Sequence, residues 1–305
     1  MPSQVLVSSQ RGRRRHIASA AALVGVLASI AGCAAPKAEH AGVVQNESMW
    51  TMPLDEFKVF NPSLSNYAEQ LLIAKCLEAQ GYEWPVPWQD TEFPQPETVN
   101  STALKIFNAD IARRYGYHDA PVPNPAEADA WSEFSAFANS YEPDGAFRAR
   151  FVACGDDARG DQTVVDVDGL NYIASLEMQA RDEISSSAAI RDAARSWKSC
   201  LSKAVTFDLP KDPWSEMPTP AMAEEYGIYG PNLTDGPTAE EIAIAEADAR
   251  CRDASGYTEV RYQTEWAAQE ALVENNRDKL DRIRNEAVAH TAELKMTIAE
   301  NAPSQ

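Results

Sequence analysis

The sequence predicts an all-α protein: a disulfide-stapled helical domain with proline-rich connections and a long C-terminal amphipathic helix. Three observations lead to this prediction. Apolar residues recur at three- and four-residue spacing in most segments, as on one face of a helix. Clusters of proline, which exclude both helix interior and central strand, separate those segments. Two-residue alternation is confined to residues 163–167, which are too few to found a sheet.

The first predicted helix ends near Gly81, a residue that readily takes the left-handed conformation at a helix C-terminus. Ser63 or Ser65 is the expected N-cap. The apolar face has helical spacing and consists of Tyr67, Leu71, Leu72 and Leu77. Prolines within residues 84–96 then predict a loop.

Six further helices are expected before the C-terminal one, five of them before residue 205. One covers residues 99–115, and the next begins at Asn124-Pro125, with proline in its first turn. That helix should bury its apolar side chains, namely Trp131, Phe134, Phe137 and Ala138. Another passes through Phe147, Phe151 and Cys154, one opens at Leu170 and fades over 185–187, and its partner covers 188–204.

The last part of the chain carries the strongest helical pattern. Residues 238–255 form a helix with acids in its first turn, and Gly256 ends it. Residues 258–300 contain neither proline nor glycine and should form a rod of roughly 60 Å with coiled-coil-like spacing. Its apolar stripe includes Tyr262, Trp266, Val273, Leu280, Ile283, Ala287, Leu294 and Ile298, interrupted by Gln269, Asn276 and His290.

We expect the two halves of this rod to differ in role. The first half carries the heavier aromatic residues and should dock on the domain. The second half has a thin seam flanked by charges, which suits one neighbouring helix. It therefore predicts a site for a protein partner or a second copy of the chain, made of Leu280, Ile283, Ala287, Leu294 and Ile298.

The N-terminus predicts export and lipidation. Arginines at 11 and 13–15 precede an uncharged apolar run over residues 17–30, which is shorter than the roughly 20 residues of a membrane-spanning helix. Ile30-Ala31-Gly32-Cys33 resembles the lipobox of bacterial lipoproteins, in which the cysteine receives the lipid. An ordinary signal peptide, or a short transmembrane anchor that contains Cys33, is the alternative. The first interpretation places the protein on the extracytoplasmic face of the cell membrane, held by a lipid on Cys33.

The predicted organisation follows from that cleavage. Residues 1–32 form the lipoprotein signal peptide, residues 33–50 a flexible tether, residues 51–257 the helical domain, residues 258–300 the long helix and residues 301–305 a disordered tail.

Charge and cysteine content limit the partners. Removal of residues 1–32 takes away four of the 27 basic residues and none of the 46 acidic ones, so the formal charge falls from −19 to −23. Such acidity excludes nucleic acid as a partner and leaves the lipid as the main membrane contact. The remaining cysteines predict two disulfides, with three possible connectivities. Sequential pairing, Cys76–Cys154 and Cys200–Cys251, closes the shorter loops and is favoured.

Candidate sites are few, and we expect no metal and no cofactor. Asp166-Val167-Asp168-Gly169 resembles part of a calcium loop, but Val164 and Ser175 stand where ligands are required. The other acids of this cluster are Asp156, Asp157 and Asp161. Tryptophans near prolines are more typical of core packing than of a stacking platform for sugars or peptides; they are Trp84, Trp88, Trp131 and Trp214.

The sequence contains no Gly-x-Ser-x-Gly, His-Glu-x-x-His or Ser-x-x-Lys motif and no glycine-rich phosphate loop. Glu177 with Asp182 or Glu183 can form an acid/base pair in principle, although surface helices contain many such pairs. His290 on the C-terminal stripe is interpreted as a tolerated polar residue rather than a catalyst. No catalytic residue is therefore assigned.

Two short motifs extend the resemblance to lipoproteins. Trp197-Lys198-Ser199-Cys200 has the form Trp-x-x-Cys, and residues 245–251 have the form Ala-x-Ala-Asp-x-x-Cys. With the lipobox, the chain resembles uncharacterised lipoproteins of high-GC Gram-positive bacteria. The resemblance implies the compartment and the disulfides and adds nothing on catalysis. We therefore expect a non-enzymatic binding or accessory component of the cell envelope; the alternative is an envelope hydrolase that uses carboxylates not identified here.

Overall fold

The structure is a computed structural model, and it describes residues 42–92, 107–121, 124–160, 167–209, 217–229, 233–234 and 236–304. Within these ranges all regular elements are helical, so the all-α prediction is confirmed. In chain order they are η1 (Glu47–Met49), η2 (Pro53–Phe57), α1 (Pro62–Glu78), α2 (Ala109–Tyr115), α3 (Pro125–Ser140), α4 (Phe147–Gly160), α5 (Val167–Ser186), α6 (Ala188–Leu201), α7 (Pro220–Tyr226), α8 (Ala239–Ser255) and α9 (Tyr257–Asn301).

Side-chain caps set most helix starts. Asn61, rather than Ser63 or Ser65, caps α1, because its side-chain oxygen accepts hydrogen bonds from the backbone N–H groups of Ser63 and Leu64. Thr238 caps α8 in the same way, through the backbone N–H of Glu241. Gly256, with φ of +64°, separates α8 from α9.

One predicted boundary is wrong. The helix expected over 99–115 begins at Ala109, because Asn108 has an extended backbone and caps α2. Residues 93–106, which carry Leu104 and Ile106 of the expected stripe, lie outside the described part of the chain.

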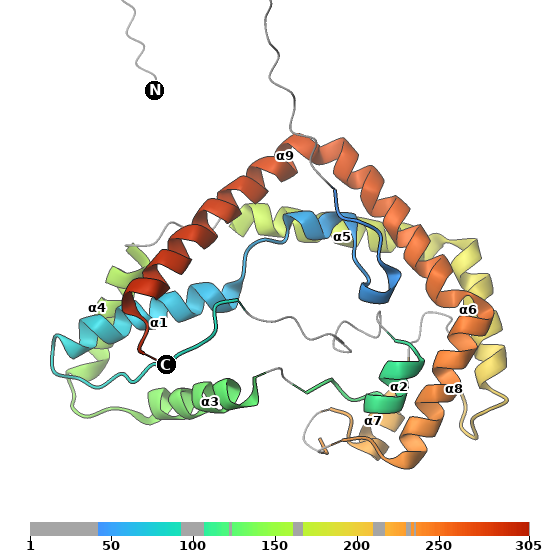
Figure 1. Cartoon of the computed structure of the whole chain (residues 1–305), viewed down its shortest axis with the longest axis horizontal. Coiled ribbons are helices and arrows are strands. Elements are labelled where there is room, and N and C mark those ends of the chain that lie inside the picture. The colour runs from blue at the N-terminus through green and yellow to red at the C-terminus, as the bar shows by residue number, and fades with distance from the viewer. Residues whose placement is uncertain are drawn as a thin grey trace, which may run out of the picture. The chain divides into compact units, whose positions relative to one another are not determined.

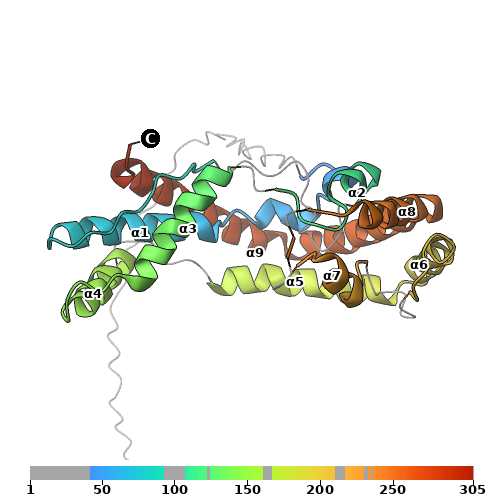
Figure 2. The same ribbon diagram turned by 90° about the horizontal axis from the view of Figure 1, so that it is seen from below.

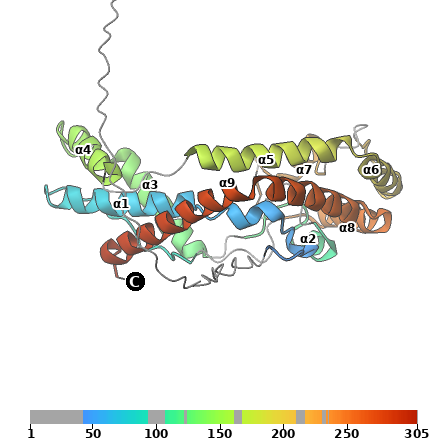
Figure 3. The ribbon, with the colours of Figure 1, turned by 90° about the horizontal axis from the view of Figure 1, so that it is seen from above.

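The long helix α9 (Figure 1) contributes side chains to each of three groups of buried residues in the described part of the chain. Its first turns pack with α6 and α8, and its middle packs with α5 and η2. Its last turns pack against α1, which also contacts α4 (Figures 2 and 3) and, through Tyr67 and Trp131, α3. Since every group needs α9, this helix holds together elements that are far apart in sequence.

Two disulfides join neighbouring helices. Cys76 of α1 pairs with Cys154 of α4, with the Cα atoms 5.7 Å apart. Cys200 of α6 pairs with Cys251 of α8, with the Cα atoms 5.5 Å apart. This is the sequential pairing that the sequence favours.

The expected partner site on the second half of α9 requires a correction. Leu280 and Ile283 are buried against η2 and α5, while Leu294 and Ile298 are buried in the group that contains α1. Ala287 is partly buried. Four of the five seam residues are therefore covered by helices of the same chain and are not exposed to a partner or second copy.

The expected domain limits also change. The compact unit begins at Gly42, inside the predicted tether of residues 33–50, and it includes α9 rather than ending before residue 258. Tyr262 explains the earlier start: its hydroxyl accepts from Asn46 N at 2.9 Å and donates to Thr51 O at 3.0 Å. At the other end, α9 extends to Asn301, so the predicted tail of residues 301–305 starts inside a helix. Asn301 Oδ1 accepts a hydrogen bond from Lys75 Nζ at 3.0 Å.

Candidate functional site

The candidate site is a cavity of about 450 Å³ between η2 and the middle of α9. It is within the size range of small-molecule sites. Residues from one face of α9 form one wall: Trp266, Glu270, Val273, Glu274 and Arg277. The opposite side consists of Gly42, Val43, Pro53 and Glu56. We call this space the η2–α9 cavity.

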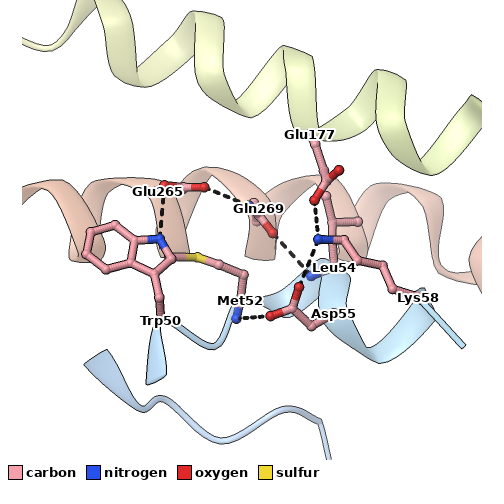
Figure 4. A network of polar contacts seen from close by, with 8 residues as sticks. All are labelled: Trp50, Met52, Leu54, Asp55, Lys58, Glu177, Glu265 and Gln269. Atoms are coloured by element: carbon pink, nitrogen blue, oxygen red, sulfur yellow. Dashed lines mark hydrogen bonds and ion pairs between the residues drawn. The ribbon is translucent and has the colours of Figure 1, made fainter. Parts of the chain in front are cut away.

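A chain of buried hydrogen bonds fixes η2 against α9 (Figure 4). Gln269 Oε1 accepts from the backbone N–H of Leu54 at 3.2 Å, and Gln269 Nε2 donates to Glu265 Oε1 at 3.2 Å. Glu265 Oε2 accepts from the indole N–H of Trp50 at 3.4 Å. Gln269, which interrupts the apolar stripe in the sequence, therefore serves a backbone group that would otherwise be buried without a partner.

A second set of contacts ties η2 to α5 (Figure 4). Asp55 accepts hydrogen bonds from the backbone N–H of Met52 at 2.8 Å and from Lys58 Nζ at 3.0 Å. Lys58 also forms an ion pair with Glu177 of α5. Burial lowers the pKa of the Lys58 ammonium, but the hydrogen bond to Glu177 and the charge of Asp55 outweigh burial and raise this pKa above its ordinary value.

Glu56 occupies the floor of the cavity as a fixed anion. Its Oε2 lies 3.1 Å from Arg277 Nη1, and its Oε1 forms an ion pair with Arg284. Both guanidinium groups lie over the ring of Phe57, at 5.3 and 5.9 Å from its centroid. Two cations thus hold one carboxylate in place, so Glu56 is suited to position neighbouring groups.

The remaining lining is amphipathic. Trp266, Val273 and Pro53 provide apolar surface, while Glu270 and Glu274 are exposed carboxylates one helical turn apart. An aromatic face next to anionic groups favours organic cations, through cation–π and Coulomb attraction. This combination can bind a ligand that has both an apolar and a cationic part.

A separate buried cluster lies where α2, α6 and α8 meet. Asp248 accepts four hydrogen bonds: from Trp197 Nε1 at 2.6 Å, from Tyr117 OH at 3.1 Å, and from Arg252 Nε and Nη2 at 3.0 and 3.3 Å. The Arg252 guanidinium lies 4.5 Å from the Trp197 ring centroid. Because Asp248 is fully buried and both its oxygens are engaged, we interpret this cluster as structural.

Glu241 and His118 extend this cluster toward α7. Glu241 Oε1 lies 3.0 Å from His118 Nδ1 and accepts from the backbone N–H of Tyr117 at 2.8 Å. A Cβ atom on Gly116 would meet this carboxylate oxygen at 2.5 Å, so glycine is required for the approach. Glu241 is 0 % exposed and His118 5 % exposed, which leaves no path for a substrate to reach this pair.

The candidates from the sequence are dispersed. Glu177 is engaged with Lys58, while Asp182 and Glu183 are exposed elsewhere on α5. Asp156, Asp157 and Asp168 are exposed on α4 and α5, whereas Asp161 and Asp166 lie outside the described residues. In the ranges that the structure covers, no three His, Cys, Asp or Glu side chains are placed to hold a metal.

The tryptophans do not form one platform. Trp84 is buried and Trp131 is partly buried, and both rings contact Phe134, at 5.6 and 5.4 Å between centroids. Trp88 is half-buried, and Trp214 lies outside the described residues. Sequence reasoning missed Glu265, although Gln269, one turn later, interrupts the apolar stripe of α9. Asp248 belongs to the Ala-x-Ala-Asp-x-x-Cys motif, but the sequence assigned it no role.

Comparison with known proteins adds no relative: no family model, no curated protein and no solved structure matches this chain. Among the helices that the structure describes, none has the length and apolar content needed to cross a membrane.

Proposed function

We propose that this protein is a lipid-anchored binding protein on the extracytoplasmic face of the cell membrane, and that it takes its ligand in the η2–α9 cavity without altering it chemically. The observation that carries the location is Ile30-Ala31-Gly32-Cys33, placed directly after a basic cluster and a short apolar run. The two cysteine pairs support the same compartment, because disulfides persist outside the reducing cytosol.

The cavity favours binding over hydrolysis. A pair of catalytic carboxylates stands on opposite sides of the bond to be cut. Here Glu270 and Glu274 share one face of one helix, and Glu56 is held by two guanidinium groups. The walls are also rigid, since buried hydrogen bonds to Gln269 fix η2 in place. A preformed amphipathic cavity is suited to a ligand that combines apolar and cationic groups.

The anchor is tested with Cys33→Ala in the native host. Without the thiol no diacylglycerol can be attached, so we expect the variant to appear in the medium or to remain unprocessed. Fractionation and mass measurement of the mature chain report both outcomes. Ala35→Ser, just after the box, is the control and should behave as wild type. If Cys33→Ala is processed and membrane-held as firmly as wild type, the anchor proposal fails.

The cavity is tested by filling it. Benzyltrimethylammonium, an amphipathic cation, should raise the melting temperature of the full chain. Glu274→Trp places a bulky ring at the cavity and removes one carboxylate, so this variant should lose the effect. Asn275→Trp is the matched control, because its exposed position does not line the cavity. Equal shifts in both variants, or no shift in the wild type, would contradict binding in this cavity.

A further inference from the structure

A second hollow, distant in sequence from the η2–α9 cavity, lies between the end of α3 and the start of α4. Its volume is about 250 Å³. Four of its lining residues are aromatic: Trp84, Tyr141, Phe147 and Phe151. Trp84 and Phe147 are buried, whereas Tyr141 and Phe151 are half-buried, so these last two rings supply the accessible apolar faces on which one ring can stack.

Contacts outside the hollow hold these rings in place. The indole N–H of Trp84 donates to Gln70 Oε1 at 3.0 Å, and the hydroxyl of Tyr141 accepts from the backbone N–H of Glu83 at 3.1 Å. The ring centroids of Trp84 and Phe151 lie 5.0 Å apart, and those of Tyr141 and Phe147 also lie 5.0 Å apart. The hollow is therefore preorganised rather than a gap that neighbouring side chains would close on their own.

The start of α4 is fixed as firmly as the rings. Asp144 Oδ1 accepts from the backbone N–H groups of Ala146 and Phe147 at 2.8 and 2.9 Å. The carboxylate also accepts from the hydroxyl of Tyr82 at 3.1 Å. Further along α4, the disulfide between Cys154 and Cys76 ties the helix to α1. The wall that α4 forms is thus held firmly on α1.

The rim of the hollow carries one cation and one anion. Arg148 Nε and Glu142 Oε1 lie 4.0 Å apart, and the two side chains are 82 % and 60 % exposed. A separation at the limit of an ion pair, in water, leaves both groups able to bind a ligand. Together they offer donors and acceptors with no net charge, which favours a neutral ligand that has hydroxyl groups. A wholly apolar ligand would desolvate both charges without replacing their hydrogen bonds.

We propose that this hollow binds a neutral pyranose sugar, whose C–H face stacks on the aromatic walls while its hydroxyl groups bond to Glu142 and Arg148. The site shares no residue with the η2–α9 cavity and does not depend on lipidation. It adds a carbohydrate-binding role to the ligand-binding function proposed above, and each can fail without the other.

The proposal is tested by NMR titration of the purified full chain with methyl β-glucoside and methyl β-N-acetylglucosaminide. For one ring in a shallow site, we expect dissociation constants on the order of 1 mM. In saturation-transfer NMR spectra, the transfer of magnetisation from the protein should be stronger to the ring C–H protons of the sugar than to the protons of the methyl aglycone. The double variant Glu142→Gln/Arg148→Ala, altered only at exposed positions, should bind at least about tenfold more weakly, because charged hydrogen-bond partners are lost.

Controls separate sugar recognition from folding and from general aromatic affinity. Arg150→Ala removes an exposed arginine from the same helix outside the hollow and should bind as wild type. Phenol, a ring without the hydroxyl pattern, should bind more weakly than either glycoside. No detectable sugar binding, unchanged affinity in the double variant, or stronger binding of phenol would each overturn the proposal.

Discussion

The indole N–H of Trp197 donates a 2.6 Å hydrogen bond to Asp248, and each residue stands three positions before a cysteine of the Cys200–Cys251 disulfide. The Trp-x-x-Cys and Asp-x-x-Cys motifs are therefore the two sides of one junction between α6 and α8. The spacing repeats because three residues make nearly one helical turn, which places the polar contact and the covalent bond on the same faces of the two helices.

Breaking this junction should destabilise the protein strongly. Trp197→Phe keeps an aromatic ring but removes the donor and part of the buried volume, so we expect a loss of at least about 1.5–3 kcal/mol, the range typical for a hydrogen bond to a charged group. Asp248→Ala should cost roughly 3–5 kcal/mol, because it leaves Arg252 buried without its partner. Urea unfolding with the disulfides intact measures both. The control Asp253→Ala, at an exposed position, should have a free energy of unfolding close to that of wild type. An equal loss of stability in this control would contradict the role of Asp248 in the junction.

Tyr117, in the same cluster, predicts a loss of stability at high pH. Burial, and next the charge of Asp248, raise the pKa of the Tyr117 phenol well above the ordinary value of 10.0. Since the folded pKa is raised, the contribution of this group to stability is present below pH 10 and is lost as the pH rises above it, where the unfolded phenol ionises.

Tyr117→Phe tests this directly. The variant loses the hydrogen bond to Asp248, so it should be less stable than wild type near pH 8. Between about pH 9.5 and 11.5 its free energy of unfolding should fall less steeply than that of wild type. Tyr229→Phe, at an exposed position, is the control and should keep the wild-type slope. Parallel pH profiles for Tyr117→Phe and wild type would contradict the assignment.

Gln269→Leu should release η2 from α9. Leucine is close in size but cannot accept the hydrogen bond of Leu54 N, so one buried backbone donor loses its partner, at a cost of about 1–3 kcal/mol. Limited proteolysis should then cut within residues 42–58 faster than in wild type. Asn275→Leu, at an exposed position of α9, should leave the cutting rate unchanged. Unaltered proteolysis of Gln269→Leu would mean that η2 does not depend on this contact.

Truncation after Asn276 should unfold much of the protein rather than remove a partner site. Leu280, Ile283, Leu294 and Ile298 would be lost, and each buried side chain of this size contributes roughly 1.5–3 kcal/mol. Thermal unfolding followed by circular dichroism should show a lower and broader transition. Truncation after Ala302, which spares α9, is the matched control. A sharp transition at the wild-type temperature would show that the distal half of α9 is not part of the core.

His290→Leu should be neutral or stabilising, by up to about 1–2 kcal/mol. His290 is 5 % exposed and stacks on Phe60, and neither ring nitrogen has a hydrogen-bond partner. Replacing a buried unsatisfied polar group by an apolar one of similar size removes its desolvation cost. Urea midpoints compare this variant with Asn285→Leu, an exposed position of α9 that should gain nothing. A clear loss of stability would mean that the imidazole contributes more than its shape.

Much of the local structure follows from sequence. Helix ends at Gly256, Thr238 and Pro125 depend on the conformation or capping of single residues, which the sequence states directly. The start of α1 was misplaced because Asn61, Ser63 and Ser65 are all good caps, and only the chain direction before Pro62 decides among them. The sequential disulfides were predictable because loop closure favours near neighbours.

The sequence by itself determined the helical class and the length of α9, because both depend on residues close together in the chain. The export and lipidation signal at the N-terminus stays a prediction from the sequence. The tertiary structure decided what covers α9. A stripe of apolar residues records that a face is buried but not whether α1 and α5 or another molecule buries it. The same holds for the η2–α9 cavity. Glu56 and Trp266 are about two hundred positions apart in the sequence, and only the packing of η2 on α9 makes both of them line one cavity.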